Sequence, residues 1–171
     1  MASSFTTNYG IEKITTGEQS GTWGTTTNYN VDILDRIAAY VSIALSNAST
    51  ATLTVRAGSP TDGANNAQNG MYRVIKFTGT LSQNCTVTIA PATTSAFFMI
   101  QNATTGGYSV IMAQGSGAQT VSVASTKAQI IYADASDEVI SISDKFNVQN
   151  FGNISISGNT ISSTNTNGDI D

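Results

Sequence analysis

Residues 85–112 read CTVTIAPATTSAFFMIQNATTGGYSVIM and decide the fold. Three short apolar runs, 85–89, 96–101 and 108–112, are separated by a Pro-Ala-Thr turn and a Thr-Gly-Gly turn. Short strands at this spacing, joined by turns of this kind, are typical of an antiparallel sandwich or barrel. Strands do not alternate with helices here, so a parallel α/β sheet is not expected.

The same pattern extends outward in both directions. Further strands are expected at residues 41–46, 53–56, 71–78, 119–123, 129–132 and 139–142. The sequence therefore predicts a mainly β protein, with an antiparallel β-sandwich or jelly-roll-like domain at residues 46–145.

Residues 1–45 have a different character. Residues 1–30 are rich in Thr, Asn and Gly and show no clean periodicity, which indicates an ordered arm. Asn28 or Asn30 can cap one short amphipathic helix from residue 31 to about residue 40, with Asp32 in its first turn. Its apolar stripe contains Ile33, Leu34 and Ile37.

Residues 146–171 form a third region, in which Ile alternates with Ser. The region has too few large side chains to bury a core of its own. Such strands gain stability by pairing with copies of themselves, so we expect the start of a fibrous β shaft with Ile154, Ile156 and Ile161 as contacts. A disordered tail is the alternative interpretation.

Composition excludes several classes of function. The 171 residues include no His, which removes the usual general base and the commonest zinc ligand. The net charge of −4 lacks the basic footprint of a nucleic-acid binder. The single Cys85 cannot form an internal disulfide and is expected to be a small core residue. No stretch is apolar enough for membrane insertion.

Charged residues make up 11% of the chain, whereas Ser, Thr and Asn account for 60 of the 171 residues. These small polar residues hydrogen-bond to their own backbone and disfavour long helices. Strands of this composition favour an interior that sister chains complete, which predicts self-association.

The residues TGEQSGTWGTT at 16–26, followed by Asn-Tyr-Asn at 28–30, resemble the opening of tail-fibre-like virion proteins of tailed bacteriophages, especially those of marine and cyanobacterial hosts. Residues 102–110 and 130–134 are similar to the β-domain of the same family, and residues 157–170 resemble its shaft. Relatives tend to have Cys followed by Asp-Gly where this chain has Ala133, Asp134 and Ala135. The resemblance implies a virion component, made in the host cytoplasm, that docks on the tail and forms a homotrimer for host attachment.

Candidate functional residues follow from these patterns. We expect docking or oligomer contacts at Trp23, Ile33, Leu34, Ile37, Ile154, Ile156 and Ile161. Trp23, between two glycines, can equally pin the arm to its own domain. Other phage tail proteins, such as an adaptor or nozzle, are the expected partners.

Rival functions remain open. One is a capsid decoration or head-fibre protein. Another is a carbohydrate-binding module for a host surface glycan, with Tyr72, Phe97, Phe98 or Tyr108 stacking on sugars.

Catalysis is not expected. The carboxylates of Asp134, Asp137 and Glu138 are explained by a solvated turn more simply than by glycosidase chemistry. Asp62 lies in a loop that lacks the charge count of a calcium site. We therefore predict no enzyme activity, catalytic residue, metal or cofactor.

Overall fold

The structure is a computed structural model that describes residues 4–56, 67–116, 119–145, 149–151, 154–157 and 160–163. From residue 145 onward only the backbone is described. Asp62 lies outside the described residues.

The described part of the protein is mainly β with one α-helix, as the sequence predicted, although the helix is longer than expected. In chain order the elements are β1 (Ser4–Phe5), β2 (Glu12–Lys13), α1 (Trp23–Ala38), β3 (Tyr40–Ala44), β4 (Thr50–Thr54), η1 (Asn69–Met71), β5 (Val74–Thr78), β6 (Cys85–Ala90), β7 (Ser95–Asn102), β8 (Val110–Gln114), β9 (Val121–Val123), β10 (Ala128–Asp134), β11 (Val139–Ser141), η2 (Ser143–Lys145), β12 (Gln149–Phe151), β13 (Ile154–Ser157) and β14 (Thr160–Ser163).

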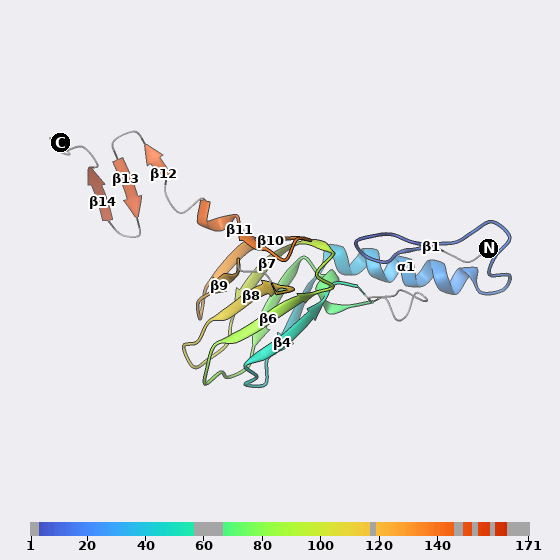
Figure 1. The fold of residues 1–171 in the computed structure, drawn as a ribbon, viewed down its shortest axis with the longest axis horizontal. Helices are drawn as coiled ribbons and strands as arrows, with labels where there is room; N and C mark the ends of the chain where they lie inside the picture. Colours follow the sequence, from blue (N-terminus) through green and yellow to red (C-terminus); the bar gives the residue numbers. More distant parts are fainter. Residues whose placement is uncertain are drawn as a thin grey trace.

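Two sheets form the β-sandwich (Figure 1). The five-stranded sheet has the order β11-β10-β7-β5-β3, and the four-stranded sheet has the order β4-β6-β8-β9. The chain passes from one sheet to the other at each step from β3 to β8, so each winding contributes one strand to each sheet. We call β3 with β4 the first winding, β5 with β6 the second and β7 with β8 the third.

This winding corrects the expectation of an antiparallel sandwich. Strands of successive windings run in the same direction, because the chain reverses twice before it returns to the same sheet. The pairs β3·β5, β5·β7, β4·β6 and β6·β8 are accordingly parallel, whereas β7·β10, β10·β11 and β8·β9 are antiparallel. The sandwich also begins at Tyr40 rather than at residue 46, since β3 belongs to the five-stranded sheet.

The hydrophobic core lies between the two sheets and is filled by the chain itself. Phe77, Phe98 and Leu53 are at most 2% exposed, and Cys85 is fully buried among them, as predicted. Most inward residues of the sandwich are thus buried within a single chain, whereas Val41, Ile43 and Ala51 of the first winding are only partly buried. The expectation that sister chains complete the interior stays a prediction.

Helix α1 begins eight residues earlier than predicted, at Trp23, and ends at Ala38. Thr and Asn in its first half are weak helix formers, but contacts with the arm stabilise this half. Trp23 N donates to Gln19 O, and Asn30, expected as a cap, instead bonds the backbone of the arm. Tertiary contact has overridden local preference.

The last three strands form a separate antiparallel sheet in the order β12-β13-β14. Ile156 and Ile161 are register partners in it, and Ile154 pairs with Ser163. The prediction of strands in this region is confirmed for the described residues. Whether they belong to a fibrous shaft stays a prediction.

Candidate interaction surfaces

Side-chain hydrogen bonds hold the N-terminal arm against α1, in a pattern that resembles the bonding between two paired strands. Asn30 Oδ1 accepts from Glu12 N at 3.0 Å, and Asn30 Nδ2 donates to Glu12 O at 2.9 Å. The carboxylate of Glu12 is buried and accepts from Gln19 Nε2, while Thr26 Oγ1 donates to Gln19 Oε1. The arm and the helix therefore form one ordered unit, although both are rich in Thr and Asn.

The C-terminal part of α1 and the arm also contact the sandwich. The guanidinium of Arg36 lies 5.4 Å from the centre of the Tyr72 ring, and that of Arg73 lies 5.5 Å from the Tyr9 ring. Burial raises the pKa of Tyr9, and the nearby Arg73 offsets part of this rise. These contacts hold one end of the helix while the rest projects from the sandwich (Figure 1).

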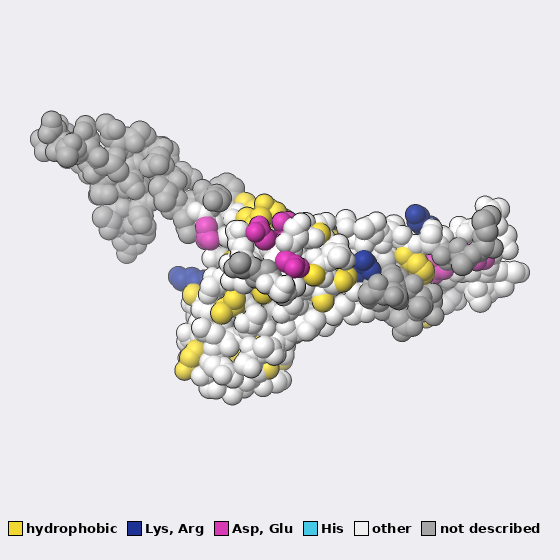
Figure 2. Space-filling view, in the orientation of Figure 1, with side chains coloured by type: hydrophobic (Ala, Val, Ile, Leu, Met, Phe, Trp, Pro, Cys, Tyr) yellow, Lys and Arg dark blue, Asp and Glu magenta, His cyan; other side chains and the backbone are white. Residues whose placement is uncertain are grey.

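The projecting helix carries an exposed apolar stripe formed by Trp23, Val31 and Leu34, which we call the helix stripe. Trp23 is 61% exposed, and Val31 and Leu34 are each 55% exposed. At 100° per residue these positions lie within one 80° sector of the helix. Figure 2 shows hydrophobic side chains exposed along α1. Exposed side chains of this size on one face are characteristic of a binding surface.

The predicted docking residues of the helix therefore divide into two groups. Trp23 and Leu34 are exposed, as a docking role requires. Ile33 is fully buried by its own chain and is removed from the docking set, because it lies on the same side of the helix as Thr26 and Asn30, which bond to the arm. Ile37 is half-buried. For the predicted shaft contacts Ile154, Ile156 and Ile161, the structure places only the backbone, in β13 and β14.

The outward face of the five-stranded sheet is unusually apolar. Tyr40, Val74, Met99 and Ile130 are successive register partners across four strands. Phe97, Tyr132 and Ile140 form a second, parallel row. Figure 2 shows hydrophobic side chains gathered where β10 and β11 lie.

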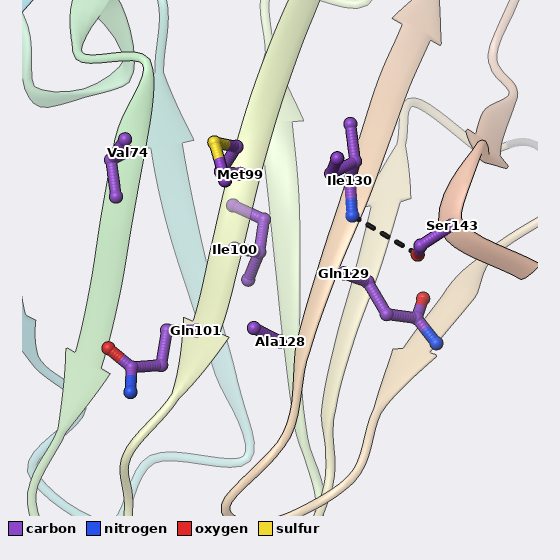
Figure 3. A pocket seen from close by; sticks show the side chains of 8 residues that line it. All are labelled: Val74, Met99, Ile100, Gln101, Ala128, Gln129, Ile130 and Ser143. Carbon is purple, nitrogen blue, oxygen red and sulfur yellow. Dashed lines mark hydrogen bonds between the residues drawn. The ribbon is translucent and has the colours of Figure 1, made fainter. Parts of the chain in front are cut away.

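A hollow of about 410 Å³ lies on this face (Figure 3). Val74, Met99 and Ile130 form its apolar part, and the carboxamides of Gln101 and Gln129 flank it. Ser143 closes one side, where its hydroxyl accepts from Ile130 N at 3.2 Å. Such a hollow can hold an apolar group beside neutral hydrogen-bonding groups.

A second hollow, of about 270 Å³, is lined in part by Phe97, Tyr132, Asn8 and Ser95. Phe97 is 40% exposed, so it can stack on a ligand. Of the four aromatic residues predicted for sugar stacking, Phe98 is wrong, because it is only 1% exposed in the core.

Two further aromatic candidates lie outside this hollow. Tyr72 is half-buried under Arg36, and Tyr108 is 38% exposed at a turn between β7 and β8.

The expected carboxylate turn is confirmed in its geometry. Asp134 Oδ1 accepts from Ser136 N at 2.7 Å and from Glu138 N at 3.3 Å, so it organises the turn between β10 and β11. Within the described ranges, no three His, Cys, Asp or Glu side chains are grouped closely enough to hold a metal ion. None of the helices in the described part of the chain combines the length and the apolar character that crossing a bilayer requires.

Sequence reasoning missed the structural role of Asn102. Its fully buried carboxamide donates to Tyr108 O at 3.0 Å and to Val123 O at 2.9 Å, and accepts from both Thr104 N and Thr104 Oγ1. All its bonding capacity is used. The sequence signal for this role was the alternation of β7, which places Asn102 on the same inward face as the core residue Ile100.

Comparison with known proteins gives no relatives: no family description, curated protein or solved structure matches the chain. The functional proposal therefore depends on the chain's own surfaces and on the resemblance given above.

Proposed function

We propose that the protein is a structural component of a tailed-phage virion, a tail fibre or the tail-proximal segment of one. In this proposal the arm and α1 dock on a tail protein, and the sandwich stands away from the docking site. The helix stripe carries the proposal, because Trp23, Val31 and Leu34 are exposed on an element that the sandwich core does not need.

The free energy gained by burying the helix stripe is large enough to support docking. Full burial of a Leu or Val side chain contributes about 1.5–3 kcal/mol, and a Trp contributes at least as much. Three half-exposed side chains therefore supply several kcal/mol when covered, which is enough to anchor a projecting helix.

The test places the chain on a particle. Virions of a phage that encodes the chain would be assembled with wild-type protein or with Leu34→Ser, and imaged with an antibody against the sandwich. We expect label at the tail and strong loss of label with Leu34→Ser. Asp32→Asn, an exposed change on the same helix outside the stripe, serves as the control and should leave the label unchanged. Label on the capsid would instead support a decoration or head-fibre protein.

A second candidate function is binding of a host surface glycan on the outward face. Phe97 and Tyr132 are register partners beside the Asn8 and Ser95 side chains, which combines an aromatic platform with neutral polar groups. A glycan array with wild-type protein and Phe97→Ala tests this candidate. Binding that survives Phe97→Ala, or a blank array, would count against it.

The homotrimer stays a prediction. Most of the described core is buried within one chain, so a trimer would form mainly through surface residues.

A further inference from the structure

The two ends of the sandwich differ in how they are closed. At one end, β9 of the four-stranded sheet contacts β10 and β11 of the five-stranded sheet, and β11 also contacts β8, so the two sheets meet. At the other end, β3 and β4 are the outermost strands of their sheets, and in the described part of the chain no strand pairs with their outer edges. We call the outer edges of β3 and β4 the open end.

Side chains of the first winding are exposed where their register partners are not. Val41 and Ile43 point inward against the core but remain partly exposed, whereas their partners Ile75 and Phe77 are at most 1% exposed. Ala51 is likewise partly exposed, although its partner Val87 is buried. The core is therefore covered by neighbouring strands everywhere except at the open end.

Backbone groups at the open end also lack strand partners among the described residues. Leu45 N donates to Thr78 O, and amide direction alternates along a strand, so the N–H and C=O groups of Ser42 and Ala44 point away from β5. On β4, Val55 N donates to Ala90 O, so the N–H and C=O groups of Thr52 point away from β6 in the same way. η1 packs against the end of β4, where Gly70 lies close to Thr54 O. Within the described residues, β3 and the rest of β4 thus present backbone groups with which no strand pairs.

Natural sheets protect such edges with charge, proline or very short strands. The closed end follows this rule, since β9 and β11 have three residues each and Asp137, Glu138 and Asp144 flank β11. The strands of the open end are longer, with five residues each, and contain no Asp, Glu, Lys, Arg or Pro; the nearest charged residues in the sequence are Arg36, before β3, and Arg56, after β4. An unprotected double edge of this kind is a pairing surface.

We infer that the open end is a contact between two copies of this chain, in which β3 and β4 of one copy pair antiparallel with the first winding of the other. Because β3 and β4 run in opposite directions in two sheets, a partner must present two strands of opposite direction at the same separation. The first winding of a second copy does so under two-fold symmetry. Because β3 and β4 contain no charged residue, pairing of these strands with their copies brings no like charges directly opposite each other.

This contact goes beyond the proposed docking role of α1 and uses different residues. A two-fold contact also requires an even number of chains in the assembly. Dimers satisfy it, and so do hexamers in which two trimers meet at their open ends.

Analytical ultracentrifugation of the full chain over the micromolar range, for wild type and for Ser42→Lys with Thr52→Lys, tests the inference. Both positions are exposed, so the fold should tolerate Lys, and a lysine on an edge strand opposes pairing. Ser122→Lys, on the outer strand of the closed end, is the matched control. We expect wild type and control to sediment as dimers or hexamers, and the double variant to dissociate at least about tenfold more readily.

Amide hydrogen exchange on the wild type gives a second readout that does not depend on a variant. The amides of Ser42 and Thr52 should exchange more slowly as protein concentration rises, whereas those of β9 should not change. A monomer or a trimer in wild type, or association that the double variant leaves unchanged, would overturn the inference. Loss of the dimer in Leu34→Ser alone would move the contact to α1 and also overturn it.

Discussion

Replacing Asn102 with Asp tests whether the buried carboxamide is a principal support of the sandwich. The change keeps the shape and the acceptor oxygen that Thr104 N reaches at 3.1 Å, but it replaces the NH₂ group by an oxygen. That oxygen then faces Tyr108 O and Val123 O, which lay 3.0 and 2.9 Å from the nitrogen. Two carbonyls lose their donor and meet a like partial charge.

The expected cost follows from these contacts. A buried acceptor left without a partner costs about 1–3 kcal/mol, so two cost about 2–6 kcal/mol. Burial of the new charge adds to this, and the bonds from Thr104 offset part of it. We therefore expect a loss of about 4 kcal/mol in the free energy of unfolding at pH 7, or about 8–16 °C in Tm for a chain of this size.

The sign of the pH dependence distinguishes this mechanism from general damage. Burial and the facing carbonyls should raise the pKa of an Asp at position 102 above its unfolded value near 3.9. The folded variant then binds a proton more readily than the unfolded chain, so its deficit should shrink as the pH falls through the raised pKa. A protonated carboxyl can donate to one of the two carbonyls again.

Urea unfolding followed by far-ultraviolet circular dichroism at neutral and mildly acidic pH measures both effects. Asn84→Asp is the control, since Asn84 is exposed and its Oδ1 only accepts, from Ser109 N at 2.9 Å. It should change stability by no more than about 0.5 kcal/mol. A deficit below about 1 kcal/mol for Asn102→Asp at pH 7, well short of the unpaired-carbonyl cost, would refute the reasoning, as would a deficit that does not depend on pH.

Three further predictions concern backbone geometry, titration and the helix stripe. Gly106→Ala should destabilise the protein by more than about 2 kcal/mol, about twice the loss for Gly107→Ala. Both glycines have positive φ, but only at Gly106 would a Cβ collide with Leu81 O. Thermal melts of the two variants measure the difference. Burial raises the pKa of the Cys85 thiol, so the folded chain holds this proton to a higher pH than the unfolded chain, and stability should fall as pH rises above about 8.5. Cys85→Ala should flatten that slope in urea titrations, and an equal slope in both proteins would contradict the assignment. Leu34→Ser should leave Tm within about 1 °C of wild type, since the side chain is exposed, and a large loss of Tm would mean that the helix stripe supports the fold instead of a partner.

The strands could be predicted from sequence to within a few residues, because side-chain alternation reports directly which residues face a core. In β7 the alternation is complete, with Ala96, Phe98, Ile100 and Asn102 buried and the residues between them exposed. Alternation does not report which strand lies beside which, and so the parallel pairing of successive windings could not be predicted. Direction depends on the connections, and these pass from sheet to sheet.

The candidate surfaces were predictable only in part. Trp23 and Leu34 follow from hydrophobicity and helical spacing, whereas the burial of Ile33 depends on tertiary packing that helical spacing does not report. The helix start was missed for the same reason. The open end is visible in the sequence as a charge-free stretch, but its meaning requires the strand order.

The register of the sandwich has a consequence for how such a protein changes in length. Val74 pairs with Met99 and Cys85 pairs with Val110, so both sheets advance by the same 25 positions from the second winding to the third. A duplicated segment of that length would stack on its parent with every inward side chain still inward, whereas an insertion of one residue within a strand would invert the pattern beyond it. The sandwich can therefore lengthen by duplication of a whole winding. Such a duplication changes the length of the molecule and leaves both of its ends unchanged.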